Sequence, residues 1–494
     1  MRRSQISAIL VVLFLALSAQ AQHQHSGSGE FGSVRFPTSC SAAVQPQFER
    51  AVAMLHSFVY EQAGTAFQEI AKSDPGCAIA WWGVAMTEYH GLWEQIRLKE
   101  GKDAVEKARD VAKSNPKTSA RERAYIEAVA LIFDDPSLPL AARAHNYEDA
   151  MAKLHAAYPD DAEAQIFYAL VLDLNAPKTD KTYAKQRQAR DLLVPLFKQQ
   201  PQHPGLAHYI IHASDFPPLA AGALDAARRY AQIAPASAHA QHMPSHIFTR
   251  LGLWEESIAS NRASAASAER VEKTAHSNEA YNQRLHAMDY LEYAYLQQGR
   301  FDEAHKVLEL CHEILRKQNL DNVGAYAAAA IPARYALERR DWKSAAALEP
   351  VTGVPANDAI TWYAKGVGAA RSGDVSTAEK AVEQLSAYRD QIGKTDKYWS
   401  QQVEIQRLQV LAWSEFAAGK RDAALQHARA AADLEDSTEK SPVTPGAIVP
   451  ARENLAQMLV EAGLQKDARL EFGSVLKVAP NRYNAMAAVR GEGN

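Results

Sequence analysis

The sequence predicts an all-α fold, a solenoid built from helical hairpins. Most of the 22 prolines and 24 glycines lie between segments with apolar helical periodicity, which is typical of many helices joined by turns. A second observation is a recurring pair, a glycine followed five residues later by Ala or Ser. Such a glycine suits the tight turn between antiparallel helices, and the small residue lets the second helix pack closely on the first. The segments are GLWEES (Gly252, Ser257), GRFDEA (Gly299, Ala304), GDVSTA (Gly373, Ala378), GKRDAA (Gly419, Ala424) and GLQKDA (Gly463, Ala468).

The first 21 residues, MRRSQISAILVVLFLALSAQA, have the pattern of a secretory signal. Two arginines precede an apolar run from Ile6 to Leu17, and a small-residue cleavage site ends at Ala21. The apolar run is short for a membrane span. We therefore expect an exported protein, periplasmic or secreted, cleaved near Ala21. Residues 22–43 begin with a stretch rich in Gly, Ser and Gln, which predicts a flexible lead-in.

Charge and cysteine content narrow the possible partners and the compartment. The formal net charge is −4 with no strongly basic block, which argues against nucleic acid as a partner. No later stretch approaches a transmembrane length, so we expect no membrane insertion of the mature chain. Cys40 and Cys77 flank the first helical hairpin, and a disulfide between them is one of two open alternatives in an oxidising compartment. Cys311 is predicted to be a buried small hydrophobe.

The repeated spacing resembles the tetratricopeptide repeat, a helix-turn-helix unit of 34 residues. The segments CAIAWWGVAMTEY and HAMDYLEYAYLQQGRFDEAHKVLEL carry its aromatic and small positions, and the resemblance covers most of residues 44–485. It implies a right-handed superhelical solenoid with one continuous core, of the exported bacterial type. Several turn glycines lie 44 to 47 residues apart, so we expect lengthened helices or loops. The expected organisation is N-terminal repeats over 44–200, central repeats over 201–320 and C-terminal repeats over 321–494.

Histidines concentrate in the central repeats. HYIIHASD and SAHAQHMPSHIFTRLGLWEES each hold a His-x-x-x-His pair, 34 residues apart, and six of the 17 histidines lie within residues 203–246. In tetratricopeptide repeats the first helix of each unit lines a concave groove, so the resemblance directs these side chains to one stretch of groove. The expected ligand-binding groove residues are His208, His212, Asp215, His239, His242, His246, Arg250, His286, Asp289 and Tyr293.

The two pairs are also candidate metal ligands. Residues four apart lie on one helix face, with about 5–6 Å between their Cβ atoms, and packed helices lie about 8–10 Å apart. His208, His212, His242 and His246 are therefore candidate ligands of one ion, with zinc and copper equally compatible. A carboxylate, Asp215 or Asp289, is expected as a further ligand or as the group that orients a histidine.

Pro244 alters the expected geometry of the second pair. Proline favours the first turn of a helix and disrupts a helix interior, so a helix is predicted to begin at Pro244. His242 would then lie on the segment that leads into the helix, and the spacing of one helical turn between His242 and His246 would be lost. Farther along, the proline-rich residues 441–449 predict an ordered loop ahead of Pro450.

Two functions remain open at this stage. The first is an exported scaffold that binds a peptide, a protein or a small polar ligand in the His- and Asp-lined groove. The second is a metal-binding protein or metalloenzyme that uses the same histidines. Duplication of a repeat or a buried hydrogen-bonded cluster would also produce such a pattern, since His56 and His90 are likewise 34 residues apart. No zinc-protease, phosphate-loop or Gly-x-Ser-x-Gly motif is present. No catalytic residue is assigned, and Glu292 is the one weak candidate for a general base.

Overall fold

The computed structural model describes residues 30–93, 95–275, 277–315 and 320–491. Within these ranges the regular structure is helical apart from one pair of two-residue strands, so the predicted all-α fold is confirmed. The predicted signal peptide, residues 1–21, and the first residues of the lead-in lie outside the described residues.

The N-terminal repeats pack successive helices against one another and contain a short antiparallel strand pair. The strands pair Tyr89 with Ile96 and His90 with Gln95, and a 3-10 helix over Gly91–Trp93 lies between them. The elements are α1 (Gln45–His56), α2 (Tyr60–Ser73), α3 (Ala78–Met86), β1 (Tyr89–His90), β2 (Gln95–Ile96), α4 (Leu98–Ser114), α5 (Ala120–Phe133), α6 (Leu140–Ala157), α7 (Ala162–Leu174) and α8 (Ala184–Gln199).

The central repeats contain the two histidine pairs and a long hairpin. A 3-10 helix over Ala220–Ala223 directly precedes α10. The elements are α9 (Pro204–His212), α10 (Leu224–Ile233), α11 (Ala238–His242), α12 (Pro244–Arg250), α13 (Trp254–Ala275), α14 (Asn278–Gln297) and α15 (Phe301–Leu315).

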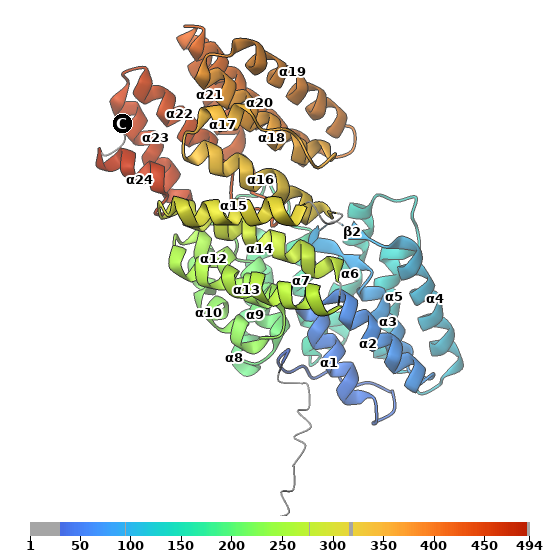
Figure 1. The fold of residues 1–494 in the computed structure, drawn as a ribbon. Helices are drawn as coiled ribbons and strands as arrows, with labels where there is room; N and C mark the ends of the chain where they lie inside the picture. The colour runs from blue at the N-terminus through green and yellow to red at the C-terminus, as the bar shows by residue number, and fades with distance from the viewer. Residues whose placement is uncertain (1–29, 94, 276, 316–319, 492–494) are drawn as a thin grey trace, which may run out of the picture.

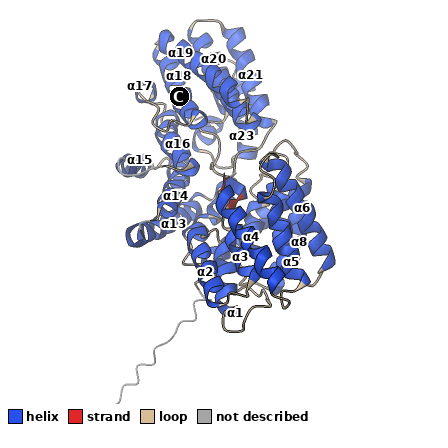
Figure 2. Cartoon of the chain, turned by 90° about the vertical axis from the view of Figure 1, so that its right-hand side faces the viewer, coloured by secondary structure: helices blue, strands red, loops and turns tan. Residues whose placement is uncertain are grey.

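The C-terminal repeats continue the array, and the predicted proline-rich loop separates two of their helices. The elements are α16 (Asn322–Glu338), α17 (Trp342–Ala346), α18 (Pro355–Ser372), α19 (Val375–Ile392), α20 (Lys397–Ala417), α21 (Arg421–Asp436), α22 (Ala451–Glu461), α23 (Gln465–Val478) and α24 (Tyr483–Arg490). In Figure 2 the C-terminal helices α18–α21 lie above the N-terminal helices α1–α8, and α13–α16 run along one side between them.

The turn glycines of the five repeated segments adopt the backbone conformation that the spacing predicts. Their φ angles lie between 66° and 83°, a region that favours glycine. Gly252 has a second reason to lack a side chain, because a Cβ there would lie 2.4 Å from the carbonyl oxygen of Pro480.

That close approach reflects contact between the end of the array and its centre. The indole Nε1 of Trp254 donates to the carbonyl of Asn481 at 3.0 Å, and the amide of Asn481 donates to the carbonyl of Gly252 at 3.3 Å. The backbone N–H of Tyr483 donates to Gln297. These contacts bring α24 to α14 and to the turn between α12 and α13 (Figure 1).

The buried apolar side chains form three clusters, where one continuous core was expected. The clusters span residues 31–248, 254–331 and 326–485. Buried polar groups accompany the boundaries: His242 on α11 and His246 on α12 lie beside α14, and Arg334 on α16 pairs with Asp289 on α14. Because polar side chains occupy these positions, apolar contacts do not run continuously along the array. Among the described residues, no helix is long and apolar enough to cross a bilayer.

A disulfide joins Cys40 and Cys77, 37 residues apart in the sequence. Cross-linking a loop of that length should stabilise the native state by about 4 kcal/mol, because it restricts the unfolded chain. We expect the Cys40→Ala/Cys77→Ala variant to unfold at a lower denaturant concentration than the wild type. Equilibrium unfolding with and without a thiol reductant measures this. The reductant should destabilise the wild type and leave the variant unchanged; equal effects on both would contradict the prediction.

Candidate metal centre

Helix α9 holds the first histidine pair. Its N-terminus is fixed by Pro204 in the first turn and by His203, whose Nδ1 accepts a hydrogen bond from the N–H of Leu206. The helix then runs uninterrupted to His212, so His208 and His212 lie one turn apart on one face. Their Nε2 atoms are 3.0 Å apart.

Helices α11 and α12 hold the second pair, and here one expectation from sequence is wrong. Helix α12 begins at Pro244, as predicted. Met243, between the two helices, nevertheless has helical angles, with φ −53° and ψ −35°. The backbone therefore continues through the proline with helical geometry, and His242 and His246 remain one turn apart. Their Nε2 atoms are 3.0 Å apart.

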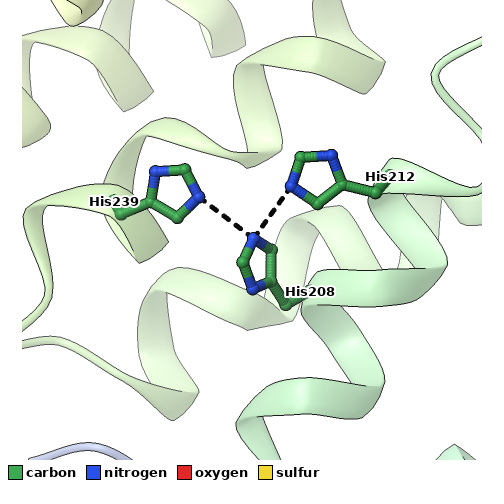
Figure 3. A group of neighbouring side chains, drawn as sticks. All are labelled: His208, His212 and His239. Carbon is green, nitrogen blue, oxygen red and sulfur yellow. Dashed lines mark hydrogen bonds between the residues drawn. The ribbon is translucent and has the colours of Figure 1, made fainter. Parts of the chain in front are cut away.

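A third histidine completes a group around each pair. His239, on α11, places its Nε2 3.0 Å from that of His208, so the rings of His208, His212 and His239 converge from two helices (Figure 3). His286, on α14, joins His242 and His246. Within each group, one ligand atom per residue lies within 4.8 Å of the others. We refer to His208/His212/His239 as the first triad and to His242/His246/His286 as the second triad.

The two triads are neighbours. The ring centroids of His212 and His246 are 6.0 Å apart, and those of His239 and His242 are 6.3 Å apart. Five of the six side chains are buried, and His286 is partly buried. Burial lowers the pKa of His208 to about 3 and lowers the pKa values of the other five as well. All six imidazoles are therefore neutral at neutral pH.

Hydrogen bonds at Nδ1 determine the tautomer of three of these histidines. The Nδ1–H of His208 donates to the carbonyl of His56 at 2.6 Å. The Nδ1–H of His246 donates to Asp215 at 2.9 Å. The Nδ1–H of His242 donates to Oδ1 of Asn261 at 2.7 Å, and the Asn261 amide N–H donates to the carbonyl of Ser257. Each acceptor is an oxygen without a proton, so the Nε2 of each of these rings carries a lone pair.

Asp215 anchors the second triad. Its carboxylate accepts from His246, from Arg250 Nε at 2.9 Å and from Lys440 Nζ at 2.6 Å. Burial alone would raise the pKa of Asp215, but Lys440 and Arg250 hold it well below its ordinary value. The carboxylate is therefore ionised and keeps the Nδ1 proton on His246. Lys440 belongs to the loop between α21 and α22, so the C-terminal repeats cover the histidines.

A cavity of about 310 Å³ adjoins the first triad. His212, Asp215 and Lys440 contribute to its lining, together with Asp173 at the end of α7. Burial and the charge of Asp215 raise the pKa of Asp173 to about 7. Asp173 thus lines the same cavity as His212 as a carboxyl group with a raised pKa.

A further cluster, His56, Glu163 and His203, has the composition of a metal site but different hydrogen bonding. Since Nδ1 of His203 accepts from a backbone N–H, its proton is on Nε2, which donates to Glu163 at 2.8 Å. Nε2 of His56 also lies 2.8 Å from Glu163. With its Nε2 protonated, His203 has no lone pair for an ion, so the cluster is a buried hydrogen-bonded network.

Two of the predicted groove residues, Asp289 and Tyr293, do not join the histidines, and neither does Glu292, the candidate general base. Asp289 and Glu292, on α14, both form ion pairs with Arg334 on α16. Burial raises the pKa of Glu292 well above its ordinary value, and its ion-pair partner is Arg334, so it is not placed as a base for chemistry at the triads. Tyr293 accepts a hydrogen bond from Arg482 and borders a second cavity of about 590 Å³, which residues of the loop between α21 and α22 also line.

Sequence reasoning missed four groups that position or adjoin the triads: the carbonyl of His56, Asn261, Asp173 and Lys440. Asn261 and Asp173 are single polar residues on otherwise ordinary helices, so no local pattern marks them. Lys440 directly precedes the predicted ordered loop, residues 441–449, and lay outside that prediction. The His56 carbonyl depends wholly on tertiary packing.

Comparisons with known proteins find similarity only among solved structures. No protein-family model matches the chain, and no curated protein matches it. The structure of yeast Tom70 matches 90% of this chain and 87% of its own, at 12% identity and a TM-score of 0.35. The human IFIT1 dimer with m7Gppp-AAAA matches 82% and 92%, at 15% identity and a TM-score of 0.33. The P58(IPK) TPR domain matches 86% and 99%, at 13% identity and a TM-score of 0.22. Because these TM-scores are low, the description of the fold is based on the helices of this chain and not on the similarity.

Glu163 should make an acid-sensitive contribution to stability. Burial alone would raise its pKa, but two histidine contacts lower the pKa to about 2, below the ordinary 4.5. A lowered folded-state pKa stabilises the protein above pH 4.5, and this stabilisation is lost as the pH falls towards 2. We expect Glu163→Gln to lose about 2 kcal/mol at pH 7, because its amide N–H would face a histidine N–H. Urea unfolding from pH 7 to pH 3 should show the difference from wild type shrinking; a difference independent of pH would contradict the assignment.

Proposed function

We propose that this protein binds two metal ions, one in each histidine triad. The triads supply three imidazole nitrogens each, which is the protein ligand number of catalytic zinc sites and leaves a position for a further ligand. Imidazole ligands suit zinc, copper, iron and nickel, whereas magnesium, calcium and manganese prefer oxygen. The sequence predicted one ion shared by the two histidine pairs, whereas this proposal places one ion in each triad.

The contact between His242 and His246 is the observation that carries the proposal. Both rings donate through Nδ1, to Asn261 and to Asp215, so both Nε2 atoms are lone-pair acceptors. Two acceptors 3.0 Å apart repel each other unless a cation lies between or beside them. A metal ion satisfies both lone pairs at once. A distance of 3.0 Å is close to the separation of about 3.3 Å that two nitrogens have in tetrahedral coordination with bonds of about 2.0–2.1 Å.

A shared proton is the alternative cation, and the surroundings disfavour it. A shared proton bridges only two of the ring nitrogens, and burial lowers the pKa values of both His242 and His246. A metal ion instead bonds to all three imidazoles of a triad, which offsets the cost of a buried charge. The first triad poses the same difficulty. The single Nε2 lone pair of His208 faces two other Nε2 atoms, and one lone pair does not accept two good hydrogen bonds.

The proposal that these histidines line a groove for a peptide or a protein has less support. The loop between α21 and α22 covers the site, and Asp215 contacts Lys440 of that loop. A partner in the groove would have to displace this loop to reach the histidines. Binding of a protein or peptide elsewhere on the array stays a prediction. For export, the disulfide between Cys40 and Cys77 supports an oxidising compartment.

The first prediction concerns stoichiometry. Protein expressed through an export pathway, without a histidine tag or chelating resin, should carry two transition-metal ions per chain after loading and dialysis. His239→Ala and His286→Ala should each leave one ion, since each removes one ligand of one triad and keeps the three Nδ1 hydrogen bonds. His305→Ala, at a half-exposed histidine on α15, is the matched control and should retain two. Elemental analysis with circular dichroism measures both metal and folding. Folded wild-type protein without metal after loading would refute the proposal.

The second prediction tests the orientation of His242. Asn261→Ala removes the acceptor of its Nδ1 proton, so the ring can rotate or change tautomer. Loss of such an outer hydrogen bond typically lowers metal affinity about 10- to 100-fold. Competition against a chelator should show this weakening for one ion only, with the first triad unaffected. Equal weakening of both ions would indicate a general loss of folding instead.

A further inference from the structure

We infer that the two triads together form a site for a pair of copper ions held as copper(I). The inference rests on the proposed metal-binding function and identifies the ion. Its basis is the charge around the triads, together with the short distance between them.

The ligand set itself supplies no negative charge. All six ligands are neutral imidazoles, and no carboxylate belongs to either triad. Asp215 is the carboxylate bonded to a triad member, and it lies behind His246 at Nδ1. Its charge is already matched by two cations, Lys440 at 2.6 Å and Arg250 at 2.9 Å. Asp173 lines the cavity beside His212 but belongs to neither triad, so a bound ion would have no carboxylate among the triad ligands to compensate its charge.

The two ions would also repel each other. Ring centroids of the facing histidines lie 6.0 and 6.3 Å apart, so ions in the two triads are neighbours in a buried region. Coulomb repulsion follows the product of the charges, so two divalent ions repel about four times as strongly as two monovalent ions at the same separation. The desolvation penalty of an ion also rises steeply with its charge. Both effects favour a monovalent ion over zinc(II), iron(II) or nickel(II).

Copper(I) is the monovalent ion that binds imidazole nitrogen, and three ligands are sufficient for it. Copper also stands above zinc in the order of affinity of divalent ions for nitrogen sites. A site of this composition should therefore prefer copper(II) to zinc(II), and the charge argument favours copper(I) over both. The cavity beside His212 gives the pair a side where a small ligand can approach.

The test is a competition titration of the folded chain, residues 22–494, under anaerobic conditions. Copper(I) is supplied as its complex with bathocuproine disulfonate, with ascorbate as the reductant, which leaves the disulfide intact. We expect the protein to withdraw two copper(I) ions per chain, and excess zinc(II) should not displace them. Copper X-ray absorption should show a copper(I) edge with three nitrogen neighbours.

Variants separate the triads from other copper ligands. The His239→Ala variant and the His286→Ala variant should each take one copper(I) ion from the chelator, and the double variant should take none. Cys311→Ala should still withdraw two, because the free thiol lies outside both triads. His305→Ala should match the wild type.

The outcomes distinguish the inference from the function on which it rests. If two zinc(II) ions bind per chain and copper(I) binds less than tenfold more tightly than zinc(II), the copper inference is wrong while metal binding stands. If neither metal binds to the folded chain, both are wrong. If one copper(I) is bound in place of two, and both single-triad variants abolish it, the triads act as one mononuclear site and the pair is refuted.

Discussion

The carboxylate of Asp215 connects the parts of the protein on which the histidine site depends. It accepts from a histidine on α12, from an arginine at the end of the same helix and from a lysine of the loop between α21 and α22. Without an ionised carboxylate, Arg250 and Lys440 would lose their closest anion, and the loop would lose one of its contacts with the centre of the array. The same interaction assigns the tautomer of His246. One side chain therefore contributes both to the docking of the loop and to the tautomer of a candidate metal ligand.

Much of the fold followed from local patterns in the sequence. Turn glycines at a fixed distance from a small residue marked the hairpins, because only tight turns and close helix packing require both features. Proline positions marked the start of α12 and the loop before α22. The histidines were found as a group because residues four apart on a helix share a face, and repeat register relates one helix to the next.

The remaining features depend on contacts between residues far apart in the chain. Helical angles at Met243 preserve the geometry that Pro244 was expected to break, and a proline pattern alone does not reveal this. The division into two triads requires the position of His286 relative to α11. The covering loop brings Lys440 to Asp215 across 225 residues. Asp289 and Glu292 had the residue types expected at a site, but Arg334 on α16 pairs with both.

The contact between Pro480 and the turn at Gly252 limits how this array can change length. In an open array a unit contacts only its neighbours, so evolution can insert or delete a unit without disturbing distant ones. Here the segment before α24 packs on the turn between α12 and α13. An additional hairpin between these points would move the segment by at least one helix spacing, about 8–10 Å, and break the contact. The number of helices from α13 to α23 is therefore constrained as it would be in a closed ring.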